Sequence, residues 1–249
     1  MGTRIGGAAN ADVMWASEGR SAATARRAGS GGFRDVGTIR ELVAASEAIL
    51  CLCPPAIAED VAGAVGAAGF RGLYVEANAI APARCERIAA VLSDQGGRVV
   101  DGAVIASNSL NLYLSGDRDD IAAAAELFVD SEVNTIRLEG GVGTASALKM
   151  AFGGWNKIGI ALSAQAYAIA RAYGVEDALA NEGVESDRVV RAGQKAWRWS
   201  PEMNEVADTC ESLGLPNGIA HGAAEVFIRW AARRDNPAQL DELLNDLGR

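Results

Sequence analysis

Short apolar runs alternate with stretches of helical periodicity through the first half of the chain. The apolar runs are Ala11–Ala16, Ala48–Cys53, Gly72–Ala77, Arg98–Asp101, Leu110–Ser115 and Asn134–Leu138. The helical stretches are Ser21–Ala28, Ile39–Ala45, Ile57–Ala68, Ala83–Gln95 and Ile121–Phe128. Because the apolar runs are nearly continuous, they indicate parallel strands buried on both faces. The pattern therefore predicts a doubly wound α/β domain.

After Gly143 the pattern changes to long helices with little strand signal. Thr144 or Ser146 can cap the first of them, which should end near Tyr173 because Gly174 follows. Its alternation of small and large residues suits packing against another helix. We therefore expect an α/β domain over residues 1–140 and an all-α domain over residues 141–249.

Composition and charge narrow the function classes. The 249 residues are 49% hydrophobic and carry a net charge of −9, with Lys and Arg scattered along the chain. This distribution gives no basic surface for nucleic acid. No apolar run reaches the roughly 20 residues of a membrane span, and no secretory signal is seen. We expect a cytoplasmic protein that binds neither nucleic acid nor membrane.

The four cysteines do not predict a metal site or a disulfide framework. Cys51 and Cys53 lie two residues apart in an apolar run, and we expect their thiols to point to opposite faces. Cys85 and Cys210 stand alone in helical patterns. We expect free thiols in a reducing compartment.

Polar residues that follow the predicted strands are the first candidate site, because ligands of such sheets sit beyond the carboxyl ends of the strands. After the first run, Ser17, Arg20 and Ser21 could surround the 2′-phosphate of a dinucleotide, although a serine there could equally cap a helix. Pro54, after Cys53, would present a stiff apolar corner. Asn78 could bind nicotinamide, ribose or substrate, or could act as a turn or cap residue.

Lys149 is the leading catalytic candidate from its surroundings. It follows a glycine-rich turn and lies among Leu148, Met150 and other apolar residues of a predicted helix. An ammonium group there either extends its head to solvent or enters a cleft where its environment changes its pKa.

Eight segments resemble the β-hydroxyacid dehydrogenase and 6-phosphogluconate dehydrogenase superfamily in order and spacing. They are Trp15–Ser21, Cys51–Pro55, Val75–Pro82, Val100–Ala106, Leu112–Gly116, Ala145–Met150, Lys195–Trp199 and Leu215–Glu225. The chain is most similar to the subgroup with a short, poorly characterised, DUF1932-like helical domain at the C-terminus.

This resemblance implies a Rossmann-like domain that binds NAD(P)H, a helical domain and a homodimer. It implies hydride transfer between nicotinamide and a hydroxyl, carbonyl or imine of a small molecule, in an interdomain cleft, with Lys149 as general acid/base. Arg20 and Ser17 would favour NADP, with NAD as the alternative. Cofactor contacts would also come from Gly2, Ser21, Cys53, Pro54 and Asn78, and substrate contacts from Asn78, Ser107, Asn156 and His221.

The chain departs from this family at its start. The first strand and the glycine-rich pyrophosphate turn are missing, and only Met1-Gly2 matches the end of that turn. A helix over Thr3–Asn10 would be shorter than usual. Either the start is placed too far downstream, or the chain is a non-catalytic binding or scaffold dimer. A non-redox small-molecule binding domain is a third, weaker hypothesis.

Further departures concern the substrate side. Gly153 replaces the family's asparagine one turn after the lysine, and Asn156 could substitute for it two turns along. Ile105-Ala106-Ser107 replaces a serine-glycine-glycine loop, which argues against a small hydroxyacid carboxylate as substrate. His221 is expected as a buried core histidine, with a substrate contact as the alternative. The C-terminal stretch Asp235–Arg249 is expected to be a solvated helix.

Overall fold

The computed structural model describes residues 1–248, and its internal contacts divide the chain into two compact units. The first unit is Met1–Lys149 and the second is Met150–Arg249. The division falls inside helix α7 (Thr144–Tyr173), whereas the sequence placed the boundary at residue 140. Each unit is described separately.

The first unit is built on a five-stranded sheet in the order β3-β4-β5-β6-β7. The strands are β3 (Ala48–Cys51), β4 (Leu73–Glu76), β5 (Arg98–Ala106), β6 (Leu110–Gly116) and β7 (Val133–Arg137). Pairing is parallel except between β5 and β6, which form an antiparallel hairpin. The expected α/β class with a mainly parallel sheet is confirmed, but the strand expected over Arg98–Asp101 continues to Ala106.

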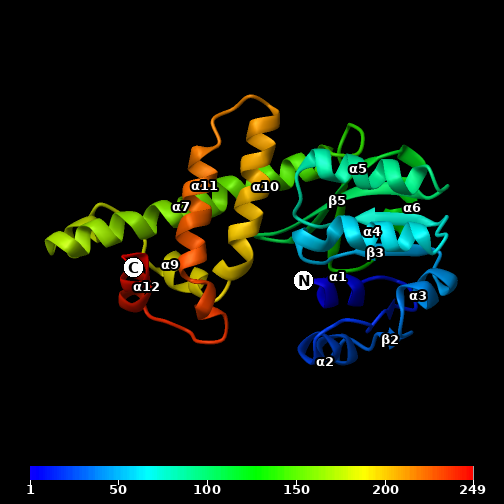
Figure 1. Cartoon of the computed structure of the whole chain (residues 1–249), viewed down its shortest axis with the longest axis horizontal. Helices are drawn as coiled ribbons and strands as arrows, with labels where there is room; N and C mark the ends of the chain where they lie inside the picture. Colours follow the sequence, from blue (N-terminus) through cyan, green and yellow to red (C-terminus); the bar gives the residue numbers. More distant parts are fainter. Residues whose placement is uncertain (249) are drawn as a thin grey trace. The chain divides into compact units, whose positions relative to one another are not determined.

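Helices cover both faces of this sheet. α4 (Ala58–Ala67) and α5 (Pro82–Ser93) pack on one face, where Tyr74 and Ile88 belong to one buried cluster. α1 (Gly2–Gly7) and α6 (Arg118–Glu126) contribute Ile5 and Ile121 to the cluster on the other face, together with Val75. Adjacent residues of β4 thus point to opposite faces, and all four are buried, as expected of a strand in a covered sheet. Figure 1 shows α4 and α5 lying along the sheet.

A second, separate sheet lies at the N-terminal end of the unit. It consists of β1 (Met14–Trp15) and β2 (Arg34–Asp35), paired in parallel, and its helices are α2 (Ala22–Ser30) and α3 (Ile39–Ala45). Among the described strands, β3 pairs only with β4. The two sheets are therefore separate among the described strands.

The second unit is helical, as expected. After α7 it contains α8 (Glu176–Asn181), α9 (Asp187–Gly193), α10 (Trp199–Ser212), α11 (Gly218–Arg229) and α12 (Leu240–Leu247). α10 and α11 pack side by side (Figure 1), and Met203, Phe227 and Trp230 are fully buried. A Cβ at Gly154 of α7 would lie 3.1 Å from a methyl of Val206, so glycine permits close packing of α7 on α10.

The C-terminal helix is not simply solvated, contrary to the sequence prediction. Leu243 and Leu244 of α12 are buried, and the Trp230 indole donates a hydrogen bond to the Leu243 carbonyl at 2.9 Å. The amphipathic spacing of these leucines explains why the helix packs on the helical core.

A buried carboxylate holds the N-terminus of α7. Asp101 of β5 accepts hydrogen bonds from the backbone N–H groups of Gly143 at 2.9 Å and Ser146 at 2.8 Å, and from the Ser146 hydroxyl at 2.7 Å. These interactions satisfy helix-terminal donors and complement the helix dipole. The start of α7 is thereby fixed against the sheet.

Across residues 1–248, none of the helices has the length and apolar character required to cross a membrane.

Candidate functional site

Apart from Gly2 and Lys149, the predicted residues of the first unit follow the carboxyl ends of β1, β3, β4 and β5. Ser17 and Arg20 come after β1, Cys53 and Pro54 after β3, and Asn78 after β4. In register, Glu76 at the end of β4 pairs with Asp101, and β5 continues five residues further to Ala106. The residues beyond this level occupy the position where ligands bind in such sheets.

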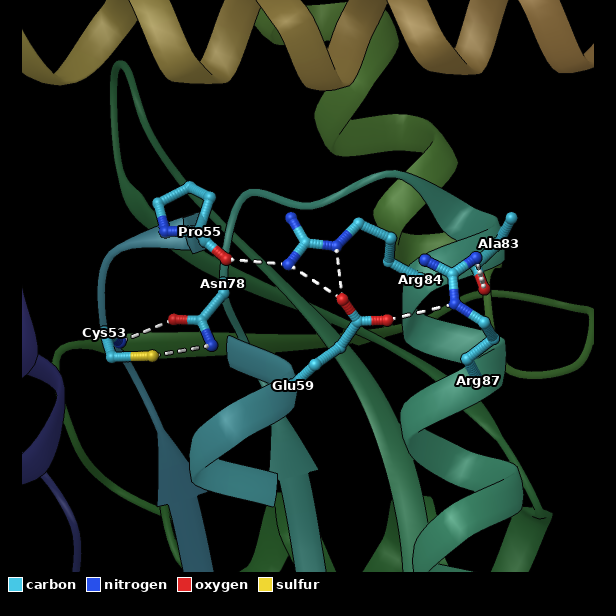
Figure 2. Close-up of polar contacts among 7 residues, drawn as sticks. All are labelled: Cys53, Pro55, Glu59, Asn78, Ala83, Arg84 and Arg87. Carbon is cyan, nitrogen blue, oxygen red and sulfur yellow. Dashed lines mark hydrogen bonds and ion pairs between the residues drawn. The ribbon is translucent and has the colours of Figure 1, made fainter. Parts of the chain in front are cut away.

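Asn78 connects the ends of β3 and β4 (Figure 2). Its Oδ1 accepts the Cys53 backbone N–H at 2.5 Å. Its Nδ2 lies 3.3 Å from the Cys51 sulfur and 3.5 Å from the Cys53 sulfur. Asn78 is buried, and its amide oxygen and nitrogen hold the ends of the two strands together, so fewer of its hydrogen-bonding groups are available to a ligand.

Two buried polar groups lie in the strand that leads to Asn78. Burial raises the pKa of Glu76 to about 9, with further upward influence from Cys51, so this carboxyl is protonated at neutral pH. Burial likewise raises the pKa of Tyr74. Neither Glu76 Oε2 nor the Tyr74 hydroxyl has a hydrogen-bond partner within residues 1–248. The sequence analysis missed both, because Tyr and Glu in a strand carry no local signal of burial.

A charged clamp joins α4 to α5 beside these strand ends (Figure 2). Arg84 donates to Glu59 at 3.1 Å and to the Pro55 carbonyl at 3.0 Å, and Arg87 donates to the other Glu59 oxygen at 3.0 Å. The clamp fixes the corner that follows Cys53. Its residues lie one and two turns into their helices, and the sequence analysis did not single them out.

In the segment after β1, Ser21 has a structural role, and Arg20 is a candidate for binding a ligand. Ser21 is the N-cap of α2 and its Oγ accepts the Thr24 N–H at 3.3 Å, so the capping alternative holds for this residue. Ser17 hydrogen-bonds Asp35, which contributes to the lowered pKa of that carboxyl after the larger effect of the Gly37 N–H. Arg20 is half-buried, and its positive charge is one of the influences that lower the pKa of Cys53. Arg20 therefore lies near the end of β3.

Lys149 is held against the extended part of β5. It is half-buried, and its ammonium donates a hydrogen bond to the Val104 carbonyl at 2.5 Å. Val104 lies beyond the level at which β3 and β4 end. The lysine head is thus anchored on a backbone oxygen of β5, beyond the carboxyl ends of β3 and β4. Ser107 is exposed in the turn between β5 and β6.

Gly2 begins α1, a helix of six residues.

The two predicted substrate residues of the second unit have different surroundings. Asn156 accepts a hydrogen bond from Arg188 at 2.5 Å, whereas His221 is exposed in the first turns of α11. The prediction of a buried core histidine is therefore wrong. The small side chains of Ala220, Ala223 and Ala224 are buried in the core instead.

Gly153 leaves space for a buried ion pair. Lys157 of α7 and Glu202 of α10 lie 2.5 Å apart, and the Lys157 ammonium is 5.7 Å from the Trp199 ring centroid. A Cβ at residue 153 would lie 3.2 Å from a Glu202 oxygen and 3.4 Å from the ammonium. A larger side chain, such as the family's asparagine, would crowd this pair.

No group of three or more His, Cys, Asp or Glu side chains that could bind a metal ion occurs in the part of the chain that the structure describes.

The sequence and the fold of this chain are similar to those of known proteins. Residues 170–230 match the model of a domain of unknown function, DUF1932. No curated protein matches the chain. A 3-hydroxyisobutyrate dehydrogenase from Salmonella typhimurium superposes with a TM-score of 0.69 at 18% identity, covering 98% of this chain and 96% of that chain.

The chain has the fold of the 3-hydroxyacid dehydrogenases. A 3-hydroxyisobutyrate dehydrogenase from Mycobacterium tuberculosis, solved with L-serine, has a TM-score of 0.68 at 16% identity over 92% of this chain and 89% of that chain. An imine reductase from Myxococcus stipitatus, solved with NADP+, has a TM-score of 0.53 at 18% identity over 92% and 90%. The expected resemblance is confirmed for the fold and for the DUF1932 segment within the helical unit.

Proposed function

We propose that this protein is an NAD(P)-dependent oxidoreductase that transfers a hydride between nicotinamide and a hydroxyl, carbonyl or imine group of a small molecule. The observation that carries the proposal is the position of the Lys149 ammonium on the Val104 carbonyl, beyond the ends of β3 and β4. A proton donor at that edge of a dehydrogenase fold lies where bound ligands react. The names of the similar structures support the same chemistry for this fold.

Lys149 acts as the general acid/base of the proposed reaction. Bound nicotinamide supplies or accepts the hydride. The Val104 carbonyl orients the ammonium, which has three N–H donors, so that one can serve a substrate oxygen or nitrogen. In reduction Lys149 gives a proton to the carbonyl or imine, and in oxidation the neutral amine takes the proton from the hydroxyl.

The residues after β1 and β3 fit a dinucleotide in part. Arg20 provides the cation that a 2′-phosphate requires, and Ser17 a neighbouring hydroxyl, which favours NADP over NAD. Cys53 and Pro54 offer a half-exposed rim at the end of β3. Gly2, at the start of α1, Ser21 and Asn78 are the remaining proposed cofactor contacts. Ser107, Asn156 and His221 stay predictions for the substrate side.

The first prediction concerns Lys149. We expect Lys149→Ala to lower kcat by about 10²- to 10⁴-fold, the usual contribution of general acid/base catalysis, while the Kd for NADPH changes by less than about twofold. NADPH fluorescence gives the Kd, and a panel of carbonyl and imine substrates gives kcat. Lys195→Ala, which removes an exposed lysine of the helical unit, is the matched control.

The outcome separates the proposed enzyme from its alternative. Binding with lost turnover in Lys149→Ala supports the assignment, and retained turnover contradicts it. A wild-type chain that fails to bind either NADPH or NADH supports the second candidate, a non-catalytic binding or scaffold protein.

We further propose that the protein is a homodimer that associates through α7. Trp155, Leu162 and Ile169 recur every seven residues on this helix and are 73%, 66% and 65% exposed. Tyr173 continues the surface at 81% exposure. A seven-residue apolar repeat is the pattern with which one helix packs against another, so a second copy of α7 is the occupant that it fits.

A further inference from the structure

Cys51 and Cys53 bring two thiols into contact at the end of β3. Their sulfur atoms are 3.8 Å apart. Residues two apart on a strand project from the same face, and Cys53 keeps this side although β3 ends at Cys51. The sequence prediction that these thiols point to opposite faces is therefore wrong, and the pair is a dithiol rather than two unrelated cysteines.

The two thiols differ in a way that suits sequential oxidation. Cys53 is half-exposed, and a hydrogen bond from Cys51 is the largest influence that lowers its pKa, with the charge of Arg20 adding to it. Cys51 is buried, and its hydrogen bond to Cys53 together with burial raises its pKa well above the usual range. Cys53 is thus the accessible nucleophile and Cys51 the protected partner.

We propose that Cys51 and Cys53 form a peroxide-sensitive dithiol that closes into a reversible disulfide. The Cys53 thiolate attacks hydrogen peroxide, forms a sulfenic acid and releases hydroxide, which takes up a proton to become water. The Cys51 sulfur then attacks the Cys53 sulfur, forms the S–S bond, and releases a second water with its own proton. Two thiols are oxidised, and one peroxide is reduced to two waters.

Chain geometry makes this disulfide a labile one. Residues two apart in an extended chain have Cα atoms separated by about 6.6–7 Å, the upper end of what a disulfide spans. Closure therefore requires Leu52 and Cys53 to contract locally, beyond the last residue of β3. A bond formed under such strain is readily reduced, which is the property of regulatory disulfides.

Closure would alter the candidate site through Asn78 (Figure 2). Asn78 accepts the Cys53 N–H and lies against both sulfurs, so a shift of Cys53 breaks these contacts and moves the rim formed with Pro54. This regulatory consequence rests on the proposed dinucleotide site, whereas the oxidation itself does not.

Oxidation of the full chain with hydrogen peroxide tests the dithiol. After treatment, blocking with N-ethylmaleimide under denaturing conditions should add two labels, compared with four for the reduced chain. Intact mass should show the loss of two hydrogens, peptide mapping should join Cys51 to Cys53, and dithiothreitol should restore four labels. A disulfide involving Cys85 or Cys210, a bond between chains, or four unreacted thiols would overturn the proposal.

Single variants test the order of the steps. In Cys51→Ser the oxidised Cys53 should remain a sulfenic acid that dimedone labels, and in Cys53→Ser the Cys51 thiol should stay reduced. Cys210→Ser, which changes a thiol of the helical unit, should form the disulfide as the wild type does. A melting temperature equal to that of the wild type shows that a variant is folded. If a variant does not fold, peptide mapping of the oxidised wild type decides the proposal.

NADPH binding tests the regulatory consequence separately. The oxidised chain should bind NADPH about tenfold more weakly than the reduced chain, equivalent to the loss of one or two contacts, and dithiothreitol should reverse the change. Equal affinities would refute regulation while leaving the mapped disulfide intact. If even the reduced chain does not bind NADPH, the proposed function fails and the mapping still decides the dithiol.

Discussion

Glu76 is a carboxyl group that the fold keeps protonated near neutral pH. It lies in the fully buried strand β4, one residue from Val75 and two from Asn78, whose N–H donates to its Oε1 at 2.9 Å. The second oxygen has no partner within residues 1–248. An ionised group there would lack the compensation that buried charges require, so the neutral acid is the form that fits the folded chain.

The raised pKa of Glu76 predicts a pH-dependent stability. The pKa of this carboxyl is 4.5 in the unfolded chain and about 9 in the folded chain. Between these values the folded chain retains a proton that the unfolded chain has lost, so stability is greatest below the lower value and falls as pH rises toward the upper one. We expect Glu76→Gln to remove this dependence, at up to about 1.4 kcal/mol per pH unit.

Urea unfolding of both chains at several pH values measures this effect. The free energy of unfolding of Glu76→Gln should rise relative to that of the wild type as the pH rises. Glu47→Gln, which removes an exposed carboxyl before β3, is the matched control. A difference for Glu76→Gln that does not vary with pH would mean that the carboxyl is ionised in the folded chain.

At the residue scale, the local pattern identified Lys149 as a candidate because a lone cation stands among apolar neighbours. The structure shows its contact with the Val104 carbonyl of β5, and its catalytic role stays a prediction. The contact between Cys51 and Cys53 was missed because their thiols were assigned to opposite faces, whereas residues two apart on a strand share one face. The exposure of His221 was not predicted, because the face of the helix on which this residue lies depends on the residue at which α11 begins.

At the scale of the elements, hydrogen bonds attach α7 to β5 near the site. Asp101 accepts three hydrogen bonds from the start of α7, and it is fully buried. The same two elements meet again where Lys149 reaches Val104. Because Asp101 fixes the first turn of the helix, it also fixes the lysine that follows one turn later.

We therefore expect Asp101→Ala to destabilise the protein by about 3 kcal/mol, because it leaves several buried donors unsatisfied. Asp117→Ala is the matched control: Asp117 caps α6 through the Asp119 and Asp120 N–H groups but is exposed. Its loss should cost about 1 kcal/mol. Equal losses in chemical unfolding would show that Asp101 is no more than an ordinary helix cap.

Most elements could be predicted because their periodicity is strong. The bounds of α3 and α7 agree with the sequence prediction, and the strands β3, β4, β6 and β7 lie where apolar runs indicated. β2 was missed because Arg34 and Asp35 are both exposed and polar. The antiparallel hairpin was missed because the pairing direction of β5 and β6 depends on a turn at Ser107 that the resemblance presented as a substrate loop.

At the scale of the whole molecule, α7 is the element that takes part in both compact units. The division by contacts falls between Lys149 and Met150, so one continuous helix carries the candidate acid/base and the apolar repeat. The proposed acid/base and the proposed dimer surface therefore share a single helix of 30 residues. Composition cannot reveal this, because the same residues would suit a buried helix.

The proposed dimer gives the fifth prediction. Leu162→Glu places a charge in the middle of the exposed apolar repeat, so the variant should sediment as a monomer of 25.8 kDa while the wild type sediments at twice that mass. Leu213→Glu, at a residue 68% exposed outside α7, should remain dimeric. A monomeric wild type, or a dimeric Leu162→Glu variant, would rule out this interface.

The separation of the β1–β2 pair from the five-stranded sheet distributes stability unevenly within the first unit. An isolated pair of short strands is marginally stable in water, so this segment opens at a lower free-energy cost than the large sheet. Ser17 and Arg20 lie in the segment. A phosphate bound there would order the chain as it binds, so discrimination between two dinucleotides would appear as a difference in local motion as well as in affinity.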